Sequence, residues 1–225
     1  NPWSALIDFA PEEDRIAYDN SETINYQGAF GQLEYANDKF SVFVQGAFSN
    51  QSYEREDRFR PAKSDKTSKT GYNLKGGLSY NLTPDNTIFL NGGHYSRQPY
   101  LDNIFNRNSG YITELVSPEV ENEKITSFEA GYHMQANRFR ANFDAYVTNW
   151  TDRTLSSFGT NDNGTPDDDQ DDFDITTLQR GITQFHTGAE LDVRYRATDW
   201  LSIKGFISGG SWYYKGEAAV STYNA

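Results

Sequence analysis

The chain has 225 residues, a net charge of -12, no cysteine and 15% aromatic residues. The negative charge argues against a nucleic-acid partner, whose phosphates require a basic surface, and no apolar run approaches the ~20 residues of a transmembrane helix. The mean hydropathy of -0.78 is typical of a soluble protein, but strands with one lipid-facing and one water-facing side also average to a low value.

A first hairpin is predicted between residues 27 and 48. The segments 27–36 and 40–48 alternate apolar and polar side chains with a period of two, which is the period of a β-strand. The three-residue turn Asn37-Asp38-Lys39 separates them. Phe43 interrupts the alternation within 40–48.

A second hairpin follows in 71–95. Segment 71–82 is the most regular of the chain, with six apolar or small residues on one parity and polar residues on the other. The turn Thr83-Pro84-Asp85-Asn86 leads into 87–95, where the pattern is ambiguous after the pair Gly92-Gly93.

Two further hairpins complete the pattern. Segments 126–134 and 139–147 flank the turn Ala136-Asn137-Arg138, and segments 185–195 and 200–213 flank Ala197-Thr198-Asp199. We therefore predict an all-β fold of about eight antiparallel strands in four hairpins.

Long polar segments alternate with these short turns. They cover 53–70, 98–122 and 152–180 and are rich in Asn, Asp and Ser. Short turns on one side and long loops on the other are typical of an outer-membrane β-barrel, with the short turns in the periplasm. The prediction is an antiparallel transmembrane barrel with these three segments outside the cell.

Charge placement favours the barrel over a soluble β-sandwich, which also alternates. Every charged residue of the clearly phased strands falls on the polar parity, as a bilayer requires because a midplane charge costs ~2–4 kcal/mol. These residues are Glu34, Lys75, Glu129, Arg140, Asp144, Glu190, Asp192, Arg194 and Lys204. Aromatic residues near strand ends are expected to form interfacial girdles: Tyr35, Phe40, Tyr72, Tyr80, Trp150, Trp200, Trp212 and Tyr213.

The phase of the strands predicts that residues 1–225 form part of a single larger barrel domain. With the short turns in the periplasm, both ends of the chain fall on the extracellular side, whereas a complete barrel of this kind ends in the periplasm. Eight strands in this phase would also leave unpaired backbone groups at two edges in hydrocarbon. We therefore expect a fragment, with the remaining strands absent.

Four segments carry motifs that go beyond the alternation. They are residues 117–132, SPEVENEKITSFEAGY, Tyr95-Ser96-Arg97-Gln98-Pro99, residues 146–153 and Gly188-Ala189-Glu190-Leu191. In this order they resemble the lead into a barrel strand, a strand end before an outer loop, a strand exit and a following strand of TonB-dependent outer-membrane receptors, of the kind common in Bacteroidetes. The segments follow the order and spacing of that family.

The resemblance implies a barrel of about 22 strands in the outer membrane of a Gram-negative bacterium. It also implies uptake of a siderophore, glycan, peptide or vitamin. The partners it implies are outer-membrane lipid, the TonB complex through a plug domain that this sequence lacks, and a surface substrate-binding lipoprotein. A passive porin, a surface adhesin and a secreted soluble β-protein stay as alternatives. No catalytic motif is found, so we expect no enzyme.

The acidic stretch 162–174 is a candidate calcium loop, because it holds seven Asp residues and a Gly turn. Calcium takes six to eight oxygen ligands, and Asp162, Asp167, Asp169 and Asp171 are the proposed ones. The spacing does not match the twelve-residue EF-hand loop. The alternative is a solvated acidic loop, which is the expectation for the shorter run Glu12-Glu13-Asp14.

Ligand contacts are expected from aromatic and arginine residues at strand exits and loops. The candidates are Tyr53, Arg58, Tyr100, Phe105, Arg107 and Tyr111, and the alternative is that they pack the loops together. His94, His133 and His186 lie on separate strands without metal-ligand spacing. Glu190 and Asp192 are expected to form a lumenal charge ladder with Arg194 and Arg196.

Overall fold

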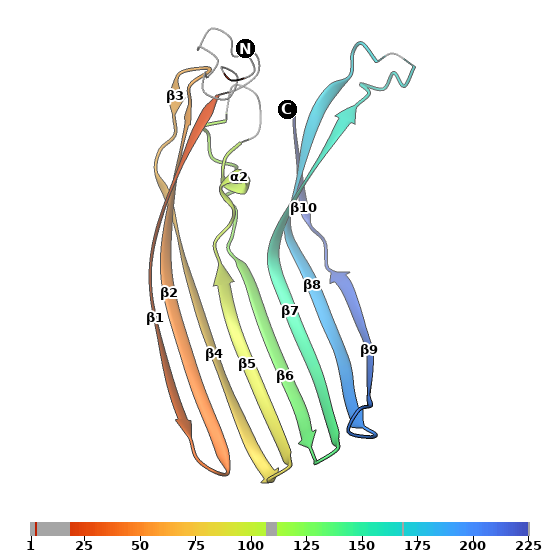
Figure 1. Cartoon of the computed structure of the whole chain (residues 1–225). Helices are drawn as coiled ribbons and strands as arrows, with labels where there is room; N and C mark the ends of the chain where they lie inside the picture. The colour runs from red at the N-terminus through yellow and green to blue at the C-terminus, as the bar shows by residue number, and fades with distance from the viewer. Residues whose placement is uncertain (1–2, 4–18, 107–111, 168, 225) are drawn as a thin grey trace.

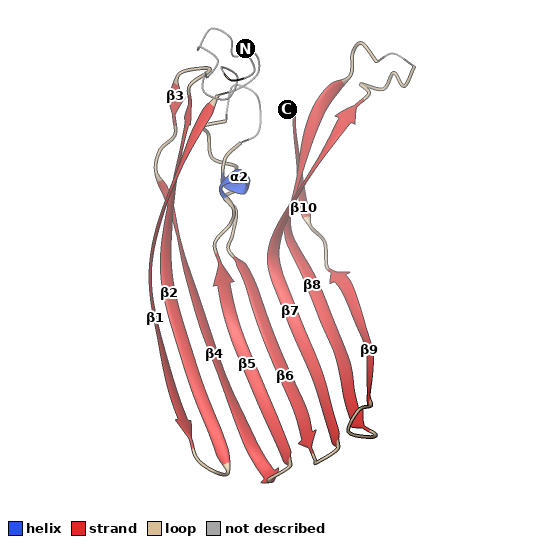
Figure 2. Cartoon of the chain, viewed as in Figure 1, coloured by secondary structure: helices blue, strands red, loops and turns tan. Residues whose placement is uncertain are grey.

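The structure is a computed structural model, and it describes residue 3 and residues 19–106, 112–167 and 169–224. Almost all of this part of the chain is strand, with one short helix (Figure 2). No helix among the described residues is both long and apolar enough to cross a membrane. The strands are β1 Asn20–Ala36, β2 Phe40–Asp57, β3 Ala62–Lys63, β4 Thr67–Thr83, β5 Asn86–Arg97, β6 Glu123–Gln135, β7 Phe139–Asn161, β8 Phe173–Arg196, β9 Ser202–Lys215 and β10 Ala219–Asn224; the helix is α2 Leu101–Ile104.

All described strands form one antiparallel sheet in the order β1-β2-β4-β5-β6-β7-β8, with β9 and β10 both beside β8. β9 pairs with the half of β8 next to the turn, and β10 pairs with its far half. The two are separated by 216–218, where Gly216 has a φ of 81° that suits glycine. The eight predicted strands are therefore present, and β10 continues the eighth.

The four predicted turns lie together at one end of the sheet (Figure 1). Side-chain bonds fix two of them: the Asn37 side chain accepts from the backbone N–H of Lys39 at 2.8 Å, and the Thr198 hydroxyl from that of Leu201 at 3.0 Å. Such Asx and Ser/Thr turns reverse the chain at low cost. The last turn is longer than predicted, because β9 begins only at Ser202.

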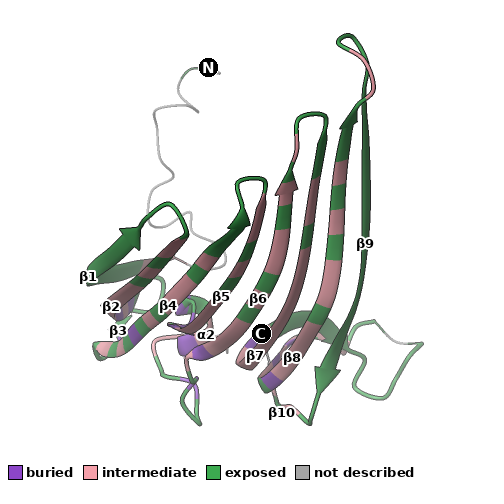
Figure 3. Ribbon diagram, turned by 90° about the horizontal axis from the view of Figure 1, so that it is seen from below, coloured by how far each residue is buried: buried purple, intermediate pink, exposed green. Residues whose placement is uncertain are grey.

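Strand register gathers the apolar parities of all strands on one face. A single row runs Tyr35, Val42, Leu78, Leu90, Ala130, Ala145, Ala189 and Gly209. Directly opposed residues share a face, so the predicted apolar sides agree across seven neighbouring pairs. The bands of alternating exposure along β6 and β8 show this period (Figure 3).

The polar face is the concave one. Residues 98–106 and 112–122, here called the strap, contact Tyr53 of β2 at one end and Leu178 of β8 at the other, although four strands separate β2 from β8. A segment can touch both only by crossing the concave side of a curved sheet. Tyr53 shares the parity of Ser41 and Gln45 in an unbroken strand, so the polar residues face inward and the apolar face is convex.

Two of the three predicted long loops are shorter than expected. β2 extends to Asp57 and β4 starts at Thr67, while β7 and β8 leave only 162–172 between them. A membrane-crossing strand needs about 9–11 residues, so the 23 residues of β7 are about twice as many as the predicted barrel requires. The polar composition of 53–57 and 152–161 indicated water contact, which a solvent-exposed hairpin satisfies as well as a loop does.

The prediction of an aromatic girdle is wrong for two residues. Trp150 faces Gln184, and Trp212 faces His186, so both rings belong to the polar, concave parity and not to the lipid face. Tyr35, Phe40 and Tyr80 do lie on the apolar parity near the turns. Strand-end position alone does not decide the face that an aromatic residue occupies.

Surface labelling tests this topology. An epitope inserted at Asp162, at the tip of the β7–β8 hairpin, is expected to bind antibody on intact cells, whereas one at Asp85 in a short turn is expected to bind only after the outer membrane is permeabilised. Labelling of Asp85 alone on intact cells would show that the sheet is oriented the opposite way.

Candidate functional site

The strap supplies most of the apolar core in the described part of the chain. At its start, Leu101 and Ile104 of α2 and the following Phe105 pack on Tyr53, and Tyr53 and Phe105 are fully buried. Apolar burial stabilises such a contact by ~25 cal/mol per Å². This cluster anchors the first part of the strap to β2.

The second part of the strap packs on the opposite side of the arc. Val116 and Val120 form a cluster with Leu178 of β8, and Tyr223 of β10 packs against it. A bridge between Phe105 and Leu115 joins the two parts of the strap, and the Val116 N–H donates to the Ile104 carbonyl at 2.8 Å. The strap is thus a folded segment inside the arc, and it ties β2 to β8.

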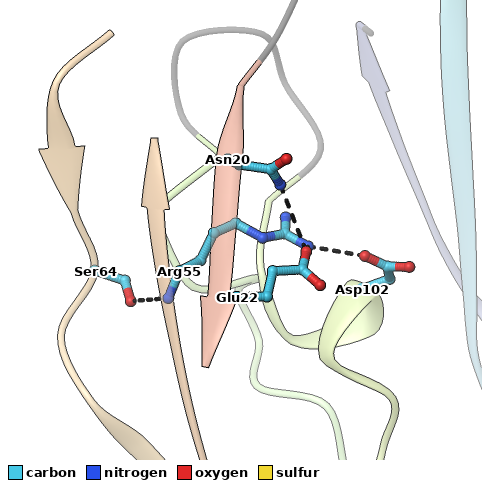
Figure 4. Close-up of polar contacts among 5 residues, drawn as sticks. All are labelled: Asn20, Glu22, Arg55, Ser64 and Asp102. Atoms are coloured by element: carbon cyan, nitrogen blue, oxygen red, sulfur yellow. Dashed lines mark hydrogen bonds and ion pairs between the residues drawn. The ribbon is translucent and has the colours of Figure 1, made fainter. Parts of the chain in front are cut away.

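Arg55 is the polar anchor of the strap (Figure 4). Its side chain is 6% exposed, and its Nη2 donates to Glu22 of β1 at 2.7 Å and to Asp102 of α2 at 2.8 Å. The guanidinium also lies 5.2 Å from the centroid of the Phe105 ring. A buried guanidinium requires such charged partners, so Arg55 links β1, β2 and the strap.

Two further hydrogen bonds hold the strap where it leaves β5. The Tyr53 hydroxyl donates to the Pro99 carbonyl at 2.9 Å, and burial raises the pKa of Tyr53 to about 12, so this donor stays protonated at physiological pH. The Gln98 amide donates to the Ser49 hydroxyl at 2.8 Å. A Cβ at Gly71 would overlap the Gln98 side chain, so glycine leaves the room that Gln98 occupies.

An open hollow lies beside the strap on the concave face. It has a volume of about 590 Å³ and is lined by residues of β1, β2, β4, β5 and β6, including Tyr26, Phe30, Asn73, Tyr95 and Arg97. Hollows of this size with a few polar groups are the usual form of small-molecule sites. The strap contributes Gln98 to its wall.

Charges on the concave wall are sorted by sign. Asp144 lies directly opposite Glu190, and Arg140, Arg194 and Lys204 form one row across three strands. Glu190, Asp192, Arg194 and Arg196 share this face, as the predicted charge ladder requires, but the ion pair found for these four residues in the described ranges joins Arg196 to Asp199 at 3.4 Å. Like charges placed opposite each other repel, so this wall requires water or an occupant.

The predicted ligand contacts divide into three groups. Tyr53 and Phe105 are fully buried between strap and wall, so they pack the strap, which was the alternative interpretation. Arg58 is half-exposed and pairs with Asp19 at 3.8 Å. Tyr100 is 65% exposed and lies under Arg97. Arg107 and Tyr111 lie outside the described residues.

The three histidines are not brought together. His94 lies 2.8 Å from the Thr126 hydroxyl, His133 lies 3.3 Å from Asp144, and His186 faces Trp212 on β9. In the described ranges, no three His, Cys, Asp or Glu side chains are grouped to hold a metal.

The acidic hairpin tip is ordered by its own side chains. Thr165 and Asn163 donate to the Asp171 carboxylate at 2.8 and 3.1 Å, and Asp162 accepts from the Gly164 N–H at 3.1 Å. Two of the four proposed calcium ligands thus take part in turn contacts, while Asp167 and Asp169 are exposed. Calcium binding here stays a prediction. The run Glu12-Glu13-Asp14 lies outside the described residues.

Comparison with known proteins places these features in a family. Residues 3–224 match the family model described as TonB dependent receptor-like, beta-barrel. The chain is also similar to the solved structure of a protein named Copper transporter OprC, with a TM-score of 0.60 and 16% identity over 84% of this chain. It spans 30% of the length of that protein. None of the curated proteins matches the chain.

Replacing Arg55 tests its anchoring role. Arg55→Gln keeps a polar side chain but removes the guanidinium and with it both charge-assisted bonds, so the strap is expected to open more often. A loss of ~1–2 kcal/mol in the free energy that holds the strap closed corresponds to about 5–30-fold more opening. The rate of limited proteolysis at 98–106 in the intact protein measures this opening.

Arg58→Gln is the matched control, because Arg58 is half-exposed and its ion pair with Asp19 is long. It should leave proteolysis at 98–106 unchanged. Equal protection of the strap in the Arg55→Gln and wild-type proteins would show that Arg55 does not anchor it.

Acid is expected to disorder the tip of the β7–β8 hairpin. Hydrogen bonds from Thr165 and then Asn163 lower the pKa of Asp171, so the ordered tip favours the carboxylate. The stabilisation of the tip by the Asp171 carboxylate is fully present above the usual Asp pKa of about 4. It is lost as pH falls through the lowered pKa of the folded tip. Hydrogen-exchange protection of 162–172 should therefore fall below pH ~4, and this fall should be smaller in Thr165→Val. An identical acid response in that variant would contradict the assignment.

Proposed function

The chain belongs to the β-barrel family of TonB-dependent receptors, and on this basis we propose that it forms part of the wall of an outer-membrane transporter for nutrient uptake. The observation that carries the proposal is the strap, which crosses the concave face between β2 and β8. The strap fills part of the space inside the arc and narrows it, and selective uptake requires such a narrowed passage. A wide passive pore needs no such segment tied to both sides.

The proposal places the apolar face in lipid and the polar face around the transport path. Exposed apolar residues follow the convex parity, among them Leu33, Leu74, Leu78 and Leu90. Charged residues such as Lys75, Glu129 and Asp192 follow the concave parity. Receptors of this family lie in the outer membrane of Gram-negative bacteria, and the chain has the two faces that this location requires.

The rest of the proposal concerns the complete receptor. Residues 1–225 would be part of one barrel domain, closed by further strands beside β1 and beside β9 and β10. A plug domain would couple it to the TonB complex, and a surface substrate-binding lipoprotein of the kind common in Bacteroidetes would be a further partner. The motif resemblance in 117–132 and 146–153 supports these points.

The substrate class stays within siderophore, glycan, peptide or vitamin in this proposal. The similar solved structure is named a copper transporter, and that name applies to the other protein. A similarity at 16% identity supports a shared fold alone, so we do not propose copper as the substrate of this chain.

Binding to TonB distinguishes the transporter from a porin or adhesin. The complete receptor, purified in detergent, is expected to retain the periplasmic domain of TonB on a resin, and deletion of the receptor's plug domain should abolish retention. A structurally intact receptor that never retains TonB would overturn the transporter proposal in favour of a passive barrel.

A further inference from the structure

We propose that the concave face of β7 and β8 carries a binding subsite for an oxyanion, meaning a carboxylate or phosphate group of the imported molecule. The inference rests on the proposed uptake function and names one chemical feature of the substrate. The residues that carry it are Trp150, Arg153, Gln184 and His186, with Arg97 at the border.

Trp150, Arg153 and Gln184 form one contact group, and His186 lies next to it on the same face. Trp150 lies directly opposite Gln184 across the β7–β8 ladder. The Arg153 guanidinium lies 4.0 Å from the centroid of the Trp150 ring and donates to the Gln184 side-chain oxygen. His186 follows Gln184 on the same face, because side chains two residues apart in a strand point the same way.

A bulge turns Arg153 toward this group. Trp150 and Arg153 are three residues apart on β7, yet they face Gln184 and Ile182, which are two residues apart on β8. Asp152, inside the bulge, has a φ of 57°, a left-handed conformation that is uncommon for residues other than glycine. Bulges redirect side chains near functional sites. Without the extra residue, position 153 would fall on the convex parity.

The positive charge of Arg153 is not neutralised by the nearby carboxylates. Glu123 pairs with Arg97 at 3.2 Å, and Asp152 pairs with Lys124 at 2.8 Å. Within the described part of the chain, Arg153 contacts the Trp150 ring and the neutral Gln184 amide, and no carboxylate. Arg153 therefore presents a free cationic group to the concave side, in a chain whose net charge is -12.

Three buried ring or guanidinium nitrogens of these residues also have no hydrogen-bond partner among the residues that the structure describes. They are Trp150 Nε1, Arg153 Nε and His186 Nε2. The indole and guanidinium nitrogens are obligate donors, and the imidazole nitrogen donates in one tautomer. A buried donor without an acceptor is costly, and an oxyanion supplies several acceptor positions at once and pairs well with arginine.

The neighbouring residues suit the rest of such a molecule. Trp212 and Tyr214 of β9 face His186 and Gln184, and the two residues are 56% and 62% exposed. Their rings offer apolar platforms beside the oxyanion site, as small-molecule sites commonly do. Arg97 joins the site to the strap, because it lies 5.9 Å from the Trp150 ring centroid and 4.8 Å from that of Tyr100.

Calorimetric titration of the complete receptor in detergent tests the inference, with inorganic phosphate and citrate as separate probes at low ionic strength. Saturable binding of at least one probe is expected, and the better one identifies phosphate or carboxylate as the preferred group. Arg153→Gln should weaken that binding by about tenfold or more, as the loss of a charge-assisted contact predicts.

Arg138→Gln is the matched control. Arg138 lies in the short turn between β6 and β7, where it donates to the Ala197 carbonyl at 3.5 Å, and the variant has the same net charge as Arg153→Gln. Binding in Arg138→Gln should equal that of the wild type. The proposal is overturned if neither probe binds saturably, or if both variants weaken binding equally. Retention of TonB by the same preparation is independent of this result, so either proposal can fail alone.

Discussion

The two-sidedness of the β-strand is the constraint on which this structure depends. Hydrocarbon offers no hydrogen-bond partner, so each backbone N–H and C=O within it must be paired by a neighbouring strand. Side chains then alternate between lipid and the interior, and one register error would exchange the two faces. The register from β1 to β7, which shifts at Asn81–Thr83 next to the β4–β5 turn, maintains this separation, and the row from Tyr35 to Gly209 shows it on the lipid side.

The interior follows from the same separation. Because the apolar side chains of the strands face outward, they cannot form a core with each other. The two buried clusters found among the described residues both involve the strap, which brings its own apolar residues to the concave face. Arg55 adds a polar anchor between β1, β2 and α2. The strap is therefore both the main source of core packing and the element that shapes the space inside the arc.

The sequence predicted the strands and their faces well because period-two alternation is a local signal. It located the four turns, and it placed Lys75, Glu129 and Asp192 on the inner face. The ends of β7 and β8 were missed because polar composition indicates exposure to water and not the absence of pairing. Trp150 was misplaced because its position at a strand end was given more weight than its parity, which it shares with the inward-facing Arg140 and Asp144.

The candidate site was less predictable. Tyr53 and Phe105 were expected to contact ligand, yet they are buried in the cluster where the strap packs on β2, and no local pattern indicates that 98–106 folds inward. Arg153 was not selected, because its direction depends on a bulge at Asp152 and its partners come from other strands. Contacts between residues distant in sequence decide such sites, and alternation carries no information about them.

Adjacent residues of one strand face lipid on one side and an aqueous interior on the other. The positions of the strap and of the proposed binding subsite both depend on this arrangement. Spin labels at Leu74→Cys and Lys75→Cys, in the complete receptor in a bilayer, test it most directly by their accessibility to oxygen and to a water-soluble nickel complex. We predict that the label at position 74 is relaxed mainly by oxygen and the label at 75 mainly by the nickel complex. Equal access of the nickel complex to both labels would contradict this arrangement.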